Sequence, residues 1–252
     1  QTAGDTAIVG IDDTEAAAIA ERIDAQAPKL MRISGKDNAA ADLRYSGSSL
    51  VACGKPVLSL AAAKTLPGDH NHQNAAAAFA ACRAAGIDAS VIAEAIFSFP
   101  GLAHRQELVT ERDGIRYVND SKATNADAAE RALGCYDPIY WIAGGRAKEG
   151  GIAPLKPYFP RIRHAFLIGE SAASFGETLG DAVPHTQCGT LDKAVDAAHS
   201  MALKEHLRGA TLLLSPAAAS WDQFDNFEQR GDRFRDQVLR LTEMGDGGEA
   251  RP

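Results

Sequence analysis

The second half of the chain alternates short apolar runs with amphipathic segments, and this alternation limits the fold more than any other feature. The runs IYWIAGG (139–145), AFLIG (165–169) and TLLLS (211–215) have the length of buried strands. Helical patterns lie between them, most clearly at 191–207. Strands that alternate with helices predict an α/β fold with a mainly parallel sheet. Ligands of such sheets bind beyond the carboxyl ends of the strands.

The first hundred residues have a more mixed pattern. TAIVG (6–10) reads as a strand and 12–22 as a helix with Thr14 as its N-cap, whereas the short runs of 30–62 are typical of a β-meander. Two further helices are predicted. The alanine-rich one spans 71–85 and ends at Gly86, and the other spans 90–99 with apolar residues at Ile92, Ala95, Ile96 and Phe99.

A Pro-Gly turn at 100–101 marks the boundary between two units, and we predict domains at 1–99 and 100–252. The second unit begins with runs at 108–111 and 115–118. They flank an Asp-Gly dipeptide, which indicates a hairpin.

Composition narrows the classes of function. The net charge of −7 makes nucleic acid a poor partner, so local clusters of Lys and Arg matter more than the total. No apolar run is long enough to span a membrane, and the first residues do not form a signal peptide. The four cysteines are far apart, without metal-ligand spacing. We expect reduced thiols, a cytoplasmic location and a monomer.

The most informative motif is NDSKATN at 119–125, which follows a strand and precedes a predicted helix. A helix start attracts phosphate or carboxylate, and Lys122, Ser121 and Thr124 add a cation and two hydroxyl donors. Asp120 is predicted to accept from a ribose hydroxyl or to hold Lys122. The alternative is an ordinary capped turn.

Two further motifs follow strand ends. GGRAKEGG (144–151) combines glycines, which allow close approach of the backbone to a ligand, with the cations Arg146 and Lys148; a solvated loop is the alternative. In SPAAASWDQFDNFEQRG (215–231), Ser220 is suited to donate to a carboxylate. Phe224 and Phe227 are predicted on one helix, where such a pair more often packs in a core.

Two short motifs remain, one in each predicted unit. GDHNHQN (68–74) opens the alanine-rich helix, and Asn71 and Asn74 share a face from which they can read an adenine edge. The two histidines of this motif lack a third ligand, so packing is favoured over a metal site. Arg105 follows the boundary and is either a nucleotide contact or a surface cation. Neither Gly-Lys dipeptide of the chain has the spacing of a phosphate-binding loop.

Taken together and in this order, the motifs GxHNxxN, GLxHRxE, NDSKATN, GGxxKxGG and LSPAxASxDQFxNFExRG resemble the Mur ligases, in particular the branch that adds D-glutamate. The resemblance covers nearly the whole chain. It implies that residues 1–99 are the C-terminal half of a central ATPase domain and that 100–252 are a Rossmann-like C-terminal domain. The phosphate-binding loop and the Mg²⁺ ligands are then expected upstream of residue 1, with no metal ligand in the chain itself.

The resemblance also implies roles for individual residues. ATP contacts are expected at Asn71, Asn74, Arg105, Asp120 and Lys122, of which Lys122 is the catalytic candidate near the phosphates. Contacts with D-glutamate are expected at Thr124, Lys148, Ser220 and the backbone near Phe227. Two residues depart from the family pattern, Ala218 where cysteine is usual and the bulky Trp221.

The implied reaction is ATP-dependent amide formation through an acyl phosphate, with D-glutamate as the amine and UDP-N-acetylmuramoyl-L-alanine as the acid. We expect the 252-residue chain alone to be inactive, because it lacks the groups that hold phosphate and Mg²⁺. Two alternatives stay open: a ligase like folylpolyglutamate synthetase, and a module that binds a nucleotide or amino acid without catalysis.

Overall fold

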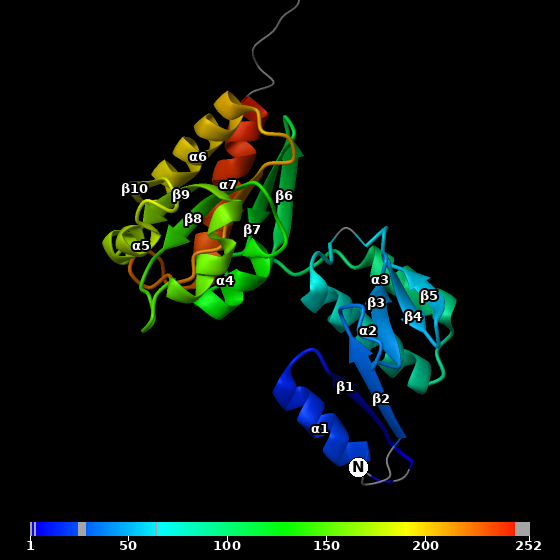
Figure 1. Cartoon of the computed structure of the whole chain (residues 1–252). Coiled ribbons are helices and arrows are strands. Elements are labelled where there is room, and N and C mark those ends of the chain that lie inside the picture. Colours follow the sequence, from blue (N-terminus) through cyan, green and yellow to red (C-terminus); the bar gives the residue numbers. More distant parts are fainter. Residues whose placement is uncertain (1, 3, 25–28, 64, 245–252) are drawn as a thin grey trace, which may run out of the picture. The chain divides into compact units, whose positions relative to one another are not determined.

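The computed structural model describes residues 2, 4–24, 29–63 and 65–244, and in these it forms two compact units, Gln1–Pro100 and Gly101–Pro252. Both units contain a twisted sheet with helices packed on it (Figure 1). The predicted α/β class with mainly parallel strands is therefore confirmed.

The first unit has a five-stranded sheet in the order β1-β2-β3-β4-β5. Its strands are β1 (Thr6–Gly10), β2 (Lys29–Ser34), β3 (Leu43–Ser46), β4 (Ser49–Ala52) and β5 (Lys55–Ser59). The first three strands run parallel, and only β3, β4 and β5 form antiparallel hairpins. The β-meander predicted for 30–62 is thus wrong at its first strand, because the helix after β1 returns the chain to start β2 alongside it.

Three helices cover this sheet: α1 (Thr14–Asp24), α2 (Asp69–Ala84) and α3 (Ala89–Ser98). The N-cap of α1 is not Thr14 but Asp13, whose carboxylate accepts from the Ala16 N–H at 2.8 Å. The end of α2 agrees with prediction: Gly86, at φ +84°, donates to the Arg83 carbonyl. Of the apolar residues predicted on α3, only Ile92 and Ile96 are buried.

The second unit has a six-stranded sheet in the order β10-β9-β8-β11-β7-β6. Its strands are β6 (Glu107–Arg112), β7 (Ile115–Asn119), β8 (Ile139–Gly144), β9 (Ile162–Ile168), β10 (His185–Gly189) and β11 (Thr211–Leu214). All neighbours are parallel except β6, which pairs with β7 through the predicted Asp-Gly hairpin. Both hairpin residues have positive φ, as a two-residue turn of this kind requires.

Two apolar cores lie against the two faces of this sheet, beneath the helices that Figure 1 labels. The helices are α4 (Ala126–Leu133), η1 (Ala153–Arg161), α5 (Ala172–Leu179), α6 (Leu191–Glu205) and α7 (Phe227–Met244). On β8, Trp141 and Ala143 join the core beneath α4, η1 and α5, whereas Tyr140 and Ile142 join the core beneath α6 and α7. A strand buried on both faces explains the unbroken apolar run in the sequence.

The burial of one histidine in this unit makes the stability of the unit depend on pH. The hydroxyl of Tyr117, a fully buried residue on β7, lies 2.7 Å from Nδ1 of His199 on α6. Burial lowers the pKa of His199 below its ordinary 6.5, against the opposing attraction of Asp113 and Asp196. The folded state therefore holds the neutral ring more strongly than the unfolded state does. The free energy of unfolding that the neutral His199 ring contributes is fully present above pH 6.5 and is lost as the pH falls through the lowered pKa of His199.

We expect His199→Gln to reduce the loss of unfolding free energy between pH 7.5 and pH 5. Urea titrations at both pH values measure this loss. The control is His206→Gln, at the residue that follows the last residue of α6. An unchanged pH slope in His199→Gln would show that this pair does not carry the effect.

Candidate functional site

The candidate site lies at one edge of the second unit, where the carboxyl ends of the parallel strands meet. The loops that leave β7, β8 and β11 at this edge carry the three strongest motifs of the sequence. Two of these loops pair directly, because Arg146 and Ala219 exchange backbone hydrogen bonds of 2.9 Å in each direction. The Gly144 N–H also donates to the Pro216 carbonyl at 2.9 Å. Segments that are about 70 residues apart in the sequence thus form one surface.

The NDSKATN loop precedes a helix, as predicted. Asn125 caps α4 by accepting from the Ala128 N–H at 2.9 Å. Asp120 lies below the loop surface with 5% of its area exposed. Its carboxylate accepts from the Gln106 N–H at 3.1 Å and from the Ser215 hydroxyl at 2.8 Å. Burial raises the pKa of Asp120 to about 7, although both hydrogen bonds and the charge of Arg105 oppose the rise.

Asp120 does not hold Lys122, which was one of its two predicted roles. The ammonium group of Lys122 instead lies over the ring of Phe227, 5.2 Å from its centroid. This cation–π contact joins the β7 loop to the first residue of α7. The Lys122 side chain remains exposed at the edge. Phe224 precedes α7, so the prediction that both phenylalanines share a helix is wrong.

The glycine-rich loop after β8 is tightly packed at its start and open further on. Gly144 and Gly145 have φ values of +125° and +131°, and a Cβ on them would lie 2.0 and 2.2 Å from the carbonyls of Ile168 and Ala219. Arg146, the first cation of the motif, forms a two-pronged ion pair with Glu170 at 2.8 and 3.0 Å. Lys148 is exposed, as is Arg146.

Each of the residues predicted to contact D-glutamate lies on this edge. Thr124 is half-buried on the β7 loop, Lys148 is exposed on the β8 loop and Ser220 is 2% exposed on the β11 loop. Phe227 begins α7, and its carbonyl accepts from the Ser121 hydroxyl at 2.7 Å. The helix α7 starts at this edge, and among its first N–H groups that of Gln229 already donates to the Asn226 side chain at 2.7 Å. The edge therefore combines an exposed cation, hydroxyl groups and a helix start, a set of groups suited to a carboxylate.

Two residues of this edge were missed in the sequence. Ser215 holds the Asp120 carboxylate, and the indole N–H of Trp141 in turn donates to the Ser215 carbonyl at 2.8 Å. Arg230 is buried although it lies in a polar stretch. Ser215 stands in the quoted LSPA motif and Arg230 in FExRG, but neither motif reveals which of its polar side chains point inward.

Arg105 is exposed at the start of the second unit, and its neighbours His104 and Gln106 are buried with positive φ. His104 packs against Gly231, where a Cβ would lie 2.2 Å from Nδ1, and it lies 3.2 Å from the amide nitrogen of Asn119. The HR-x-E motif is thus partly structural, because it fixes the chain that presents Arg105.

Within the first unit, Asn71 and Asn74 share a face of α2 as predicted, with their side chains 3.5 Å apart. Asn71 also donates to the Pro67 carbonyl at 2.8 Å. Asn74 lines an apolar groove of about 410 Å³ between α2 and α3. The ring of His72 stacks on that of Tyr45 with their centroids 3.6 Å apart, so the side chain is packed at the start of this helix.

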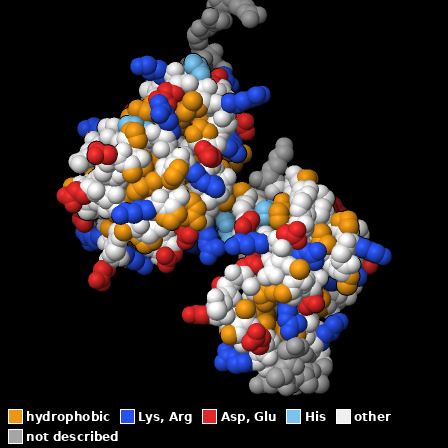
Figure 2. Space-filling model, in the orientation of Figure 1, with side chains coloured by type: hydrophobic (Ala, Val, Ile, Leu, Met, Phe, Trp, Pro, Cys, Tyr) orange, Lys and Arg blue, Asp and Glu red, His pale blue; other side chains and the backbone are white. Residues whose placement is uncertain are grey.

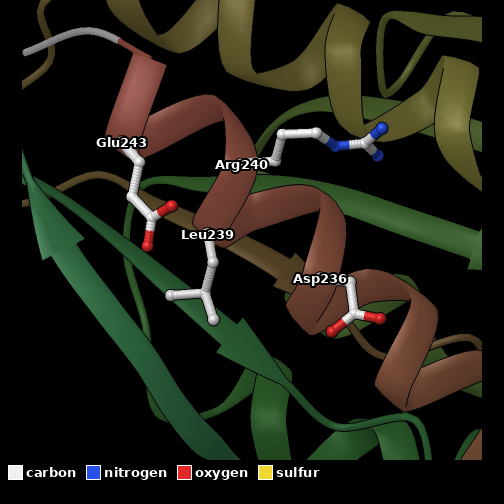
Figure 3. Close-up of a pocket in the computed structure, with 4 residues that line it drawn as sticks. All are labelled: Asp236, Leu239, Arg240 and Glu243. Carbon is white, nitrogen blue, oxygen red and sulfur yellow. The ribbon is translucent and has the colours of Figure 1, made fainter.

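The described residues contain no group of three or more His, Cys, Asp or Glu side chains that could hold a metal ion. No helix among them has the length and hydropathy of a membrane span. On the face that Figure 2 shows, acidic and basic side chains are interspersed over both units. Another depression is lined by Asp236, Leu239, Arg240 and Glu243 of α7, well along that helix from Phe227, and includes none of the predicted site residues (Figure 3).

Comparison of the fold with solved structures identifies the class of protein. The UDP-N-acetylmuramate–alanine ligase of Thermotoga maritima matches with a TM-score of 0.56 at 16% identity, over 84% of this chain and 48% of that one. The folylpolyglutamate synthase of the same organism matches with a TM-score of 0.55 at 16% identity, over 94% and 54% of the two chains. The fold is that of the Mur and folylpolyglutamate ligases. No family model matches the chain.

Sequence relatives narrow this class to one branch. The chain is 51% identical to the UDP-N-acetylmuramoylalanine–D-glutamate ligase of Paramagnetospirillum magneticum, over 97% of this chain and 53% of that protein. It is 60% identical to that of Rhodospirillum rubrum over 75% and 40%, and 51% identical to that of Rhizobium etli over 95% and 52%. The Mur ligase resemblance is confirmed: the chain is a homologue of the UDP-N-acetylmuramoylalanine–D-glutamate ligases and spans about half their length.

Proposed function

We propose that this chain supplies the D-glutamate site, and part of the ATP site, of an ATP-dependent ligase that joins D-glutamate to UDP-N-acetylmuramoyl-L-alanine. One observation carries the proposal: the loops after β7, β8 and β11 present Thr124, Lys148 and Ser220 at one edge of the sheet. The names of relatives at 51–60% identity supply the amino acid and the acid that are joined.

In the proposed reaction, the alanine carboxylate attacks the γ-phosphorus of ATP and ADP leaves, which gives an acyl phosphate. The amine of D-glutamate then attacks the acyl carbon, phosphate leaves and an amide forms. This edge would hold the amine donor by its carboxylates: Lys148 and Thr124 bind the side-chain carboxylate, and Ser220 with the first N–H groups of α7 binds the α-carboxylate. Positioning of this kind is the main contribution a protein makes to such a step.

ATP would be contacted by Asn71, Asn74, Arg105, Asp120 and Lys122. Lys122 is the catalytic candidate, because its exposed ammonium group can stabilise charge on a transferring phosphoryl group. Mg²⁺ is the metal such a reaction uses, and it neutralises phosphate charge. From the resemblance to the Mur ligases, we propose that its ligands lie upstream of residue 1. We further propose a cytoplasmic monomer that acts on small molecules, with neither nucleic acid nor a membrane as a partner.

The site assignment is tested by Lys148→Ala in a complete ligase that contains this chain. We expect the KM for D-glutamate to rise about 10- to 100-fold, because a charge-assisted hydrogen bond to a carboxylate contributes about 1.5–3 kcal/mol. The KM for ATP should change little. Steady-state phosphate release measures both, with Lys156→Ala as the matched control, since Lys156 is an exposed lysine of the same unit. A D-glutamate KM within twofold of the parent value would exclude Lys148 from the site.

The same assay separates the alternatives. Turnover with D-glutamate and not with L-glutamate supports the proposed reaction, whereas a preference for L-glutamate supports a folylpolyglutamate synthetase-like ligase. We expect the 252-residue chain by itself to form no amide. If the 252-residue chain binds D-glutamate but a longer chain that contains it shows no turnover, the chain is a binding module.

A further inference from the structure

Arg230 is a long, charged side chain that is almost completely buried, with 1% of its area exposed. It lies in the first turn of α7, next to the candidate site. Its Nε donates to the Ser121 hydroxyl at 3.0 Å, one terminal nitrogen donates to the Ser121 carbonyl at 2.8 Å, and the other donates to the Ala218 carbonyl at 3.1 Å. Burying a guanidinium group is costly, so a residue in this position requires an explanation beyond packing.

The hydrogen bonds of Arg230 reach two of the three loops of the site, and its guanidinium lies close to the third. Ser121 belongs to the β7 loop, three residues before Thr124, and Ala218 belongs to the β11 loop, two residues before Ser220. The third loop follows β8 and carries Lys148. Its Gly145 approaches the guanidinium so closely that a Cβ would lie 3.3 Å from the terminal nitrogen. One side chain thus hydrogen-bonds to the β7 and β11 loops and lies close to the β8 loop, which in turn pairs with the β11 loop through Arg146 and Ala219.

The charge of Arg230 is not neutralised by a hydrogen-bonded carboxylate. All three of its hydrogen bonds go to uncharged oxygens, and Asp222 supplies only an attraction through space. Burial lowers the pKa of Arg230 to about 10, which still leaves it charged at neutral pH. A positive charge of this kind directly below the loops favours an anionic ligand above them.

We propose that Arg230 is the positioning residue of the carboxylate site: it joins the β7 and β11 loops by hydrogen bonds, and the β8 loop follows through its backbone pairing with the β11 loop, so that Thr124, Lys148 and Ser220 can bind one dicarboxylate amino acid. The inference rests on the proposed function for the identity of the ligand, but the joining of the loops is independent of it. Lysine at this position keeps the charge but loses the planar fork that reaches two loops at once.

Two measurements on the 252-residue chain test this inference. Amide hydrogen exchange is followed at 121–125, 145–151 and 217–220 in the parent, in Arg230→Lys and in Arg230→Gln. Titration with D-glutamate, followed by NMR shifts of the same amides, gives the Kd. The control is Arg240→Lys, an exposed arginine further along the same helix (Figure 3). For Arg230→Lys we expect exchange at least about tenfold faster in all three loops and a Kd at least about tenfold higher, with the Arg240→Lys variant unchanged.

The outcomes separate the two hypotheses. Exchange that stays at the parent rate in any of the three loops of Arg230→Lys overturns the positioning role, whatever the ligand. Faster exchange throughout the unit, rather than in the loops, shows a general structural role and also overturns it. If exchange in the three loops is faster in Arg230→Lys but the parent chain does not bind D-glutamate, the proposed function alone is contradicted. If Arg230→Gln does not fold, the lysine variant still decides.

Discussion

Alanine in place of Gly144 is expected to destabilise the second unit by about 4 kcal/mol or more, which is among the largest effects of a single methyl group. Gly144 ends β8 with φ at +125°, a conformation that alanine rarely adopts. The added Cβ would lie 2.0 Å from the Ile168 carbonyl oxygen. That carbonyl accepts from the Gly145 N–H at 3.1 Å, so relief of the clash would break the pairing of β8 with β9 at the edge of the site.

Thermal and urea unfolding of Gly144→Ala measure this effect. Gly134→Ala is the matched control: Gly134 has φ at −71°, and a Cβ there would lie no closer than 3.4 Å to its neighbours. We expect the control to stay within about 1 kcal/mol of the parent. A Gly144→Ala protein as stable as the control would show that the loop can move, and the tight start of the glycine-rich loop would then not fix Lys148.

Asparagine in place of Asp120 is expected to stabilise the protein at alkaline pH and to have much less effect at pH 5. Burial raises the pKa of Asp120 from 3.8 to about 7. The folded state therefore binds a proton between these pH values that the unfolded state does not. Stability falls as the pH rises through this range and stays low above pH 7. A difference of about 3 pH units corresponds to about 4 kcal/mol at most, and we expect about 2–4 kcal/mol.

The asparagine side chain can keep both hydrogen bonds of Asp120, because its oxygen accepts from the Gln106 N–H and the Ser215 hydroxyl can turn to accept from its amide. Urea unfolding at pH 5 and pH 8.5 measures the effect, with the exposed Asp127→Asn as control. A parallel pH dependence of Asp120→Asn and the parent would mean that Asp120 is ionised in both states. Because Asp120 is also a proposed ATP contact, the stabilised variant should lose activity in the complete ligase, an exchange of stability for function.

The comparison of sequence with structure shows which signals are local. The strands 139–145, 165–169 and 211–215 were predicted because a strand buried on both faces is apolar throughout, and the hairpin because its turn needs Asp-Gly. By contrast, β10 (HTQCG) was not predicted, since an edge strand that is half-exposed has no apolar run. The pairing of β2 with β1 also depended on a neighbour that the local pattern does not contain. The N-cap at Asp13, by contrast, is a local contact with Ala16 three residues on, and the sequence offered Asp13 and Thr14 as adjacent candidates.

The sequence by itself determined the kind of fold, the order of the motifs and the Mur ligase resemblance, because periodicity and motif chemistry are properties of short segments. Only the tertiary structure decided which polar groups face inward. Asp120 is buried under Ser215, Lys122 lies on Phe227 and Arg230 connects two loops that are far apart in the chain. Such pairings follow from the crossover connections between parallel strands, which bring distant loops to one edge of the sheet. No local pattern of residues shows which loops become neighbours there.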